Sequence, residues 1–141
     1  MNDLEAIRRL IALYGQLLDS KRLDDWGELF VEDAVFRVWD RTYKGRAEIQ
    51  REIGGMQPER PGKHVILQPV IDLDDKRHAR AWTDLTAFST EEDNSISIAT
   101  IGRYHDRLER SDKDERWRFR QRVLVMEGEE VPGDVDPSPP L

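Results

Sequence analysis

Three long segments in the second half of the chain place the strongest constraint on its fold. They span residues 79–90, 95–111 and 116–127, and the connections EEDN and DKDE between them are short and acidic. Extended runs rich in β-branched and aromatic residues, separated by turns of this kind, predict neighbouring antiparallel strands. We therefore expect the second half of the chain to form a meander of long strands.

The first half of the chain supplies helices. Apolar residues recur at three- and four-residue spacing over residues 3–19, and Asp3 is a suitable N-cap. Shorter helices are expected at residues 23–30 and about 46–55. Three helices followed by a strand meander predict the α+β class, with helices packed on one face of a curved antiparallel sheet. A curved sheet closed by helices forms a cone-shaped barrel around a pocket that suits a small molecule.

Two further strands are expected before the meander, one between the second and third helices and one after the third helix. AVFRVW, residues 34–39, alternates so that Phe36 and Val38 share one face. After RTYKG, which is typical of a turn, and a loop rich in glycine and proline, residues 63–72 read as a strand. Because a chain of 141 residues favours one domain, we expect a single domain over residues 1–127. Residues 128–141 are rich in proline and acidic residues, which predicts a mobile tail with little to bury.

Composition excludes several classes of function. The chain carries 22 Lys and Arg against 29 Asp and Glu, a net charge of −7, which argues against binding to nucleic acid or an anionic membrane. There is no cysteine, so thiol nucleophiles and zinc–thiolate sites are excluded. The N-terminus does not resemble a signal peptide, and we expect a cytoplasmic protein. No metal-binding, nucleotide-binding or serine-hydrolase motif is present.

Asp19 is the first candidate for chemistry. It lies near the end of the first helix, where the helix dipole favours cations over a carboxylate. The small residues Ala12 and Gly15 lie on about the same helical face, which leaves space for a cavity. A solvated helix-end carboxylate, partly compensated by Lys21 and Arg22, is the alternative.

His64 is the second candidate, at the start of the 63–72 strand. Imidazole is the side chain best suited to proton transfer near neutral pH. A carboxylate on one ring nitrogen fixes the tautomer and stabilises the imidazolium that forms when the other nitrogen takes a proton. An Asp19–His64 pair therefore makes chemical sense as a catalytic dyad. Of the other histidines, we expect His78 at the surface and His105 on the strand face opposite Tyr104.

Other residues are candidates to line the pocket or to lie outside it. Arg118, Arg120 and Arg122 share a parity on the last strand, and most of this row should be exposed or paired because buried arginines are costly. One bulge would reverse the face that Arg122 occupies. The remaining candidates for the cavity lining are apolar or aromatic: Tyr14, Trp26, Phe36 and Val38.

These motifs together resemble the SnoaL-like group of the nuclear-transport-factor-two-like superfamily. The resemblance covers about residues 4–126 and rests on YGQLLDSKRLDDWGELFVEDAVF, YKGRAEI, KHVILQPVIDLD and IGRYHDRLERSDKDERWRFRQRV. It implies an α+β barrel with a conical sheet around a pocket, usually in a homodimer or homotrimer.

Within that group the arrangement of the motifs most resembles that of scytalone dehydratase and hexachlorocyclohexane dehydrochlorinase. The resemblance implies a catalytic pair at Asp19 and His64, an arginine at Arg122 and an aromatic pocket position at Phe36, with Tyr14 a looser match. Where the dehydrochlorinase carries a lysine, this chain has Tyr14, which argues against that chlorinated substrate.

Two kinds of function remain open. The first is an enzyme of the dehydratase or dehydrohalogenase type, or an isomerase or polyketide-cyclase-like enzyme. It would need no cofactor and would remove a proton from a small apolar or aromatic molecule. The second is a non-catalytic binding or assembly domain, such as the small subunit of a ring-hydroxylating dioxygenase. An open apolar cavity ending at His64 favours the enzyme, and a filled one favours the binding domain.

Overall fold

The computed structural model describes residues 1–141, with three helices and seven strands. The helices are α1 (Asp3–Asp19), α2 (Leu23–Gly27) and α3 (Arg46–Gly55). The strands are β1 (Phe30–Val38), β2 (Arg41–Lys44), β3 (Gly62–Ile66), β4 (Val70–Leu73), β5 (His78–Thr90), β6 (Ile96–Arg110) and β7 (Trp117–Met126). The predicted α+β class is confirmed.

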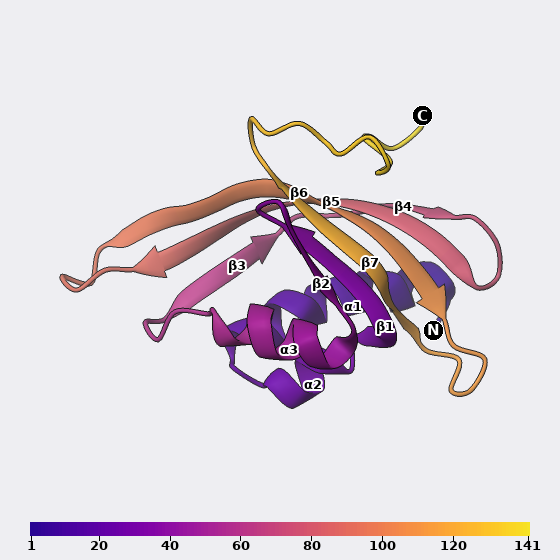
Figure 1. Ribbon diagram of the computed structural model, residues 1–141, viewed down its shortest axis with the longest axis horizontal. Helices are drawn as coiled ribbons and strands as arrows, with labels where there is room; N and C mark the ends of the chain where they lie inside the picture. Colours follow the sequence, from indigo (N-terminus) through magenta and orange to yellow (C-terminus); the bar gives the residue numbers. More distant parts are fainter.

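All seven strands belong to one curved sheet, and the helices lie against its concave side (Figure 1). The strand order is β2-β1-β7-β6-β5-β3, with β4 also paired to β5. Two details differ from the expected antiparallel barrel. The sheet does not close on itself, and β1 pairs with β7 in the parallel direction. Parallel neighbours need a crossover connection, and here α3 and five strands intervene between the two.

Several element boundaries differ from the sequence-based expectations for local reasons. The expected strand over residues 63–72 is two strands, β3 and β4, because Pro69 between them has no backbone N–H to donate to a ladder. The segment expected as a turn forms β2, and the two-residue turn lies earlier, at Trp39 and Asp40. Helix α1 has its predicted bounds, but its N-cap is Asn2, whose side chain accepts from the Glu5 amide at 2.9 Å.

Helix α1 packs on the concave face of the sheet through one apolar stripe. Ile7, Ile11 and Leu18 on this stripe are almost completely buried. Gly15 allows the helix to approach β3 closely, since a Cβ there would lie 2.8 Å from Ile66 Cδ1 and 3.3 Å from His64 Cβ. The expectation that Gly15 leaves space for a cavity is therefore wrong: β3 occupies that space.

One bulge in β7 determines which side chains face inward. Arg107 of β6 lies opposite Gln121, but the next residue, Leu108, lies opposite Phe119, so Arg120 is an extra residue in β7. A bulge of this kind reverses the alternation of side chains beyond it. As a result Arg122 turns to the concave side, where it is fully buried.

The C-terminal tail crosses the convex face of the sheet (Figure 1). Val135 is buried against Val123 and Val125. The backbone carbonyl of Asp136 accepts from the Trp82 indole at 3.1 Å and lies 2.8 Å from His105 Nδ1. The expectation of a tail with little to bury is therefore not met, because these contacts cover an apolar patch of the sheet.

Deletion of residues 129–141 should lower the free energy of unfolding by about 2 kcal/mol, since Val123 and Val125 lose the side chain that covers them. Urea denaturation measures this difference. Deletion of residues 138–141 alone is the matched control, because no residue of that segment is buried, and it should leave stability unchanged. Equal stability of both truncated chains and the full chain would contradict the packing role of the tail.

Candidate active site

A cavity of about 220 Å³ lies on the concave side of the sheet. Of its 25 lining residues 14 are hydrophobic. The lining comes mainly from α1, β1 and the turn after it, α3 and the loop after it, and strands β3, β5, β6 and β7. Apolar cavities with a few convergent polar groups are typical ligand sites. The polar groups of this cavity include the side chains of Asp19, His64, Tyr14 and Tyr104.

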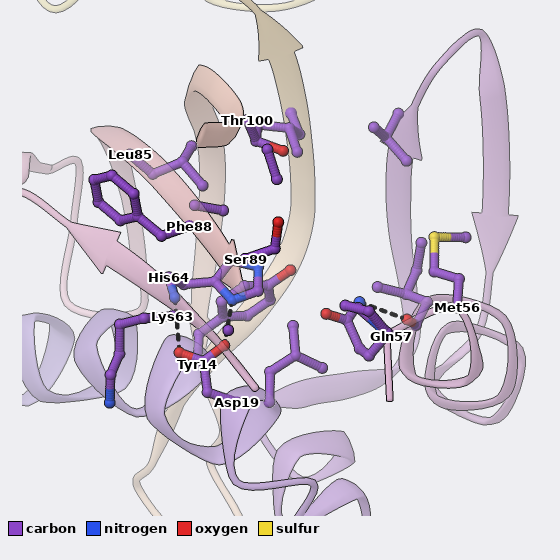
Figure 2. A pocket seen from close by; sticks show the side chains of 18 of the residues that line it. Tyr14, Asp19, Met56, Gln57, Lys63, His64, Leu85, Phe88, Ser89 and Thr100 are labelled. Atoms are coloured by element: carbon purple, nitrogen blue, oxygen red, sulfur yellow. Dashed lines mark hydrogen bonds and ion pairs between the residues drawn. The ribbon is translucent and has the colours of Figure 1, made fainter. Parts of the chain in front are cut away.

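The structure brings Asp19 and His64 together at one end of this cavity (Figure 2). Asp19 Oδ1 lies 2.5 Å from His64 Nδ1, and Oδ2 accepts from the His64 backbone N–H at 2.7 Å. The two side chains are 10% and 19% exposed, so the contact is shielded from most solvent. Both carboxylate oxygens are engaged by one residue, which fixes the position of the ring relative to α1.

The contacts with His64 explain how the Asp19 carboxylate is stabilised at the C-terminal end of α1. The helix dipole disfavours negative charge there, and α1 has no basic residue in its last turn. The His64 N–H groups compensate instead, because an ionised carboxylate only accepts hydrogen bonds. Nδ1 must then be the protonated nitrogen of the neutral ring, which leaves Nε2 as an acceptor. Nε2 has no hydrogen-bond partner in the protein. It is also not among the fully buried polar atoms that lack a partner, so it keeps some accessible surface.

Two tyrosines supply further polar groups to the cavity. Tyr14 on α1 and Tyr104 on β6 are buried, with ring centroids 5.4 Å apart. Burial raises the pKa of the Tyr14 hydroxyl, and the nearby Arg122 charge opposes only part of this effect. Burial likewise raises the pKa of Tyr104 well above its ordinary value. Both hydroxyls therefore remain protonated at neutral pH and can donate a hydrogen bond.

Arg122 lies behind these rings and does not line the cavity. Its Nε and Nη2 donate to the two carboxylate oxygens of Asp106, both at 2.8 Å, and both side chains are fully buried. The guanidinium carbon lies 3.7 Å from the ring centroid of Tyr104, 4.2 Å from that of Tyr14 and 4.1 Å from that of Phe119. Its remaining nitrogen, Nη1, is buried without a partner.

The other predicted site residues divide into two groups. Phe36 and Val38 line the cavity, in agreement with their expected face of β1. Trp26 does not, because it is fully buried behind Tyr14, with ring centroids 5.5 Å apart. His78 is exposed, and His105 faces the tail on the convex side.

Sequence reasoning did not select Tyr104 and Asp106 as site residues. The alternation of β6 does place Tyr104 and Asp106 on one face. An inward-facing carboxylate, however, can be assigned a role only when the cation opposite it is known. Asp106 lies opposite Arg122 in the sheet register, and the bulge in β7 brings that arginine inward.

No group of three or more His, Asp or Glu side chains is arranged to hold a metal ion. None of the helices combines the length and apolar character that crossing a membrane requires.

The arrangement of sheet, helices and cavity is that of an NTF2-like, cystatin-like fold. An NTF2-like protein with a cystatin-like fold from Novosphingobium aromaticivorans superimposes with a TM-score of 0.81, at 25% identity, over 91% of this chain and 84% of that one. A proposed scytalone dehydratase from the same organism gives a TM-score of 0.75 at 23% identity, over 88% and 83% of the two chains. The β subunit of a proposed aromatic-ring-hydroxylating dioxygenase, also from that organism, gives 0.75 at 23% identity, over 91% of each chain.

The family model of the SnoaL-like domain matches residues 1–123, and the chain belongs to this family. The resemblance inferred from the sequence motifs is thereby confirmed. No curated protein matches the sequence.

The contribution of the buried Asp106–Arg122 pair to stability can be tested by substitution. Asp106→Ala leaves the Arg122 charge buried without a partner and should cost about 3–5 kcal/mol of unfolding free energy, measured by urea denaturation. The matched control is Asp84→Ala on the neighbouring strand, which breaks an ion pair to Arg103 whose side chains are about half exposed. That change should cost at most about 1 kcal/mol. An equal loss of unfolding free energy in the two variants would contradict the claim that the buried pair stabilises the protein more than an exposed one.

Proposed function

We propose that the protein is a cofactor-independent enzyme that removes a proton from a small, largely apolar substrate, with His64 as the general base. Elimination, as in a dehydratase or dehydrohalogenase, is the leading reaction, and isomerisation is the second. The observation that carries the proposal is the contact of Asp19 with His64 Nδ1, with Nε2 left unpaired at a mainly apolar cavity.

In the proposed reaction a substrate C–H donates its proton to His64 Nε2. The imidazolium that forms stands 2.5 Å from the Asp19 carboxylate, which stabilises its charge. In an elimination the electron pair of the broken C–H bond forms a carbon–carbon double bond as the leaving group departs. The proton then passes from Nε2 to the leaving group or to water.

The negative charge that develops on the substrate needs hydrogen-bond donors placed in advance. Tyr14 and Tyr104 fit this role, since both line the cavity and both stay protonated at neutral pH. Arg122 cannot contact a substrate directly from its position behind the rings. Its charge lies against the faces of both phenols and favours their role as donors.

A non-catalytic binding or assembly domain is the competing function. The likeness to a dioxygenase β subunit agrees with it, although at this level of identity such a likeness concerns the fold alone. The cavity favours the enzyme, because His64, whose Nε2 has no hydrogen-bond partner in the protein, belongs to its mainly apolar lining. A polar contact kept only for structure would not need an unpaired acceptor on a residue that lines a cavity.

Exchange of the C1 protons of 2-tetralone in D2O, followed by proton NMR, tests proton abstraction without knowledge of the natural leaving group. The wild-type protein should accelerate exchange over the buffer rate. His64→Ala and Asp19→Asn should each lose about 100-fold or more of that acceleration, as expected when general-base catalysis is removed.

The matched control is His78→Ala, which removes an exposed histidine that also contacts an aspartate. This variant should retain the wild-type rate. Undiminished exchange in His64→Ala would end the proposal. If the wild-type protein binds 2-tetralone without accelerating exchange, the binding domain becomes the better assignment.

A further inference from the structure

The hairpin between β1 and β2 has an unusual residue at its tip. Val38 pairs with Arg41, so Trp39 and Asp40 form a two-residue turn, and both have positive φ values, 51° and 57°. Positive φ at both central positions defines a type I′ turn, which favours Asn-Gly or Asp-Gly. A bulky aromatic residue in this conformation is a true outlier. Trp39 is the only aromatic residue of the chain with positive φ.

Trp39 is also unusual in its exposure. Its relative exposure is 53%, whereas Trp26, Trp82 and Trp117 are 0%, 3% and 5% exposed. Trp39 belongs to the lining of the cavity that contains His64. Met56, at the end of α3, is 41% exposed and lines the same cavity. Apolar side chains thus continue from the cavity to its solvent-exposed rim.

Local conformation and exposure both disfavour tryptophan at this position, so neither explains its presence. A residue held in a costly backbone conformation at the edge of a cavity points to a role for its side chain. The cavity itself holds about 220 Å³, which limits what it can enclose. A planar apolar molecule longer than this space would project through the mouth, where an indole offers it a flat surface.

We propose that Trp39 forms an outer subsite that binds the projecting part of a planar, polycyclic apolar ligand whose reactive end lies at His64. The subsite deepens the proposed function, because it rests on the cavity being the ligand site, but it does not depend on catalysis by His64. It sets the length of ligand that binds well rather than the chemistry performed on it.

Two phenols that differ by one fused ring test the subsite. 2-Naphthol is the short probe and 2-anthrol is its longer linear homologue, and the fluorescence of each probe reports its dissociation constant. Trp39→Asn places a residue favoured in this turn at its first position. We expect this variant to raise the melting temperature by about 2–5 °C. It should weaken 2-anthrol binding roughly tenfold or more and leave 2-naphthol binding within about twofold.

Asp40→Gly is the matched control. It relieves the second left-handed residue of the same turn and keeps the indole, so it should raise the melting temperature without changing either dissociation constant. Acrylamide quenching gives an independent readout, because Trp39 is the one exposed tryptophan. 2-Anthrol should protect the wild-type protein from quenching more than 2-naphthol does.

Three results would overturn the subsite. The first is unchanged 2-anthrol affinity in Trp39→Asn, and the second is an equal loss for both probes, which would make Trp39 a general support of the cavity. The third is a change in oligomeric mass in Trp39→Asn by light scattering, which would assign the indole to contact between chains. A wild-type protein that binds neither probe would overturn the ligand site as well, and so the proposed function with it.

Discussion

The Asp106–Arg122 ion pair holds together the part of the structure on which the candidate site is built. It joins β6 to β7, and the guanidinium group lies against the rings of Tyr14 and Tyr104. Because Tyr14 belongs to α1, the same cation helps dock the helix that ends at Asp19. A buried charge of this kind is favourable only while its partner and its surroundings compensate the loss of water. The contact between this cation and Tyr14 of α1 thus depends on a single bulge that turns Arg122 inward.

Local patterns were sufficient to predict most of the secondary structure. The apolar periodicity of α1 and the flanking residues of α3 gave bounds that match the structure, and the bounds of the long meander strands differ from the predicted ones by at most one residue. The errors in strand pairing and in the packing of the tail come from interactions between distant segments. The parallel pairing of β1 with β7 has no local signature. The burial of Val135 depends on a convex apolar patch that exists only after the sheet forms.

The candidate site shows the same division between local and distant information. Asp19 and His64 were selected because their chemistry and positions fit a family pattern, and the structure places them in contact. Arg122 was selected as a pocket residue. The extra residue of the bulge in β7 turns it inward, but it lies behind the rings of Tyr14 and Tyr104 and does not line the cavity. Sequence alternation cannot locate such an extra residue, since it depends on the register with β6. Tyr104 and Asp106 acquire their roles only through that register.

The location of His64 on β3 affects where the protein unfolds locally and which segment a ligand would stabilise. β3 has five residues, lies at an edge of the sheet and pairs with β5 alone among the strands. Edge strands with few partners open at a lower free energy than the centre of a sheet. The Asp19 carboxylate restrains this strand through both the ring and the backbone of His64. A ligand bound against His64 would therefore slow amide hydrogen exchange in β3 first, while the amides at the centre of β6 would exchange only with global unfolding.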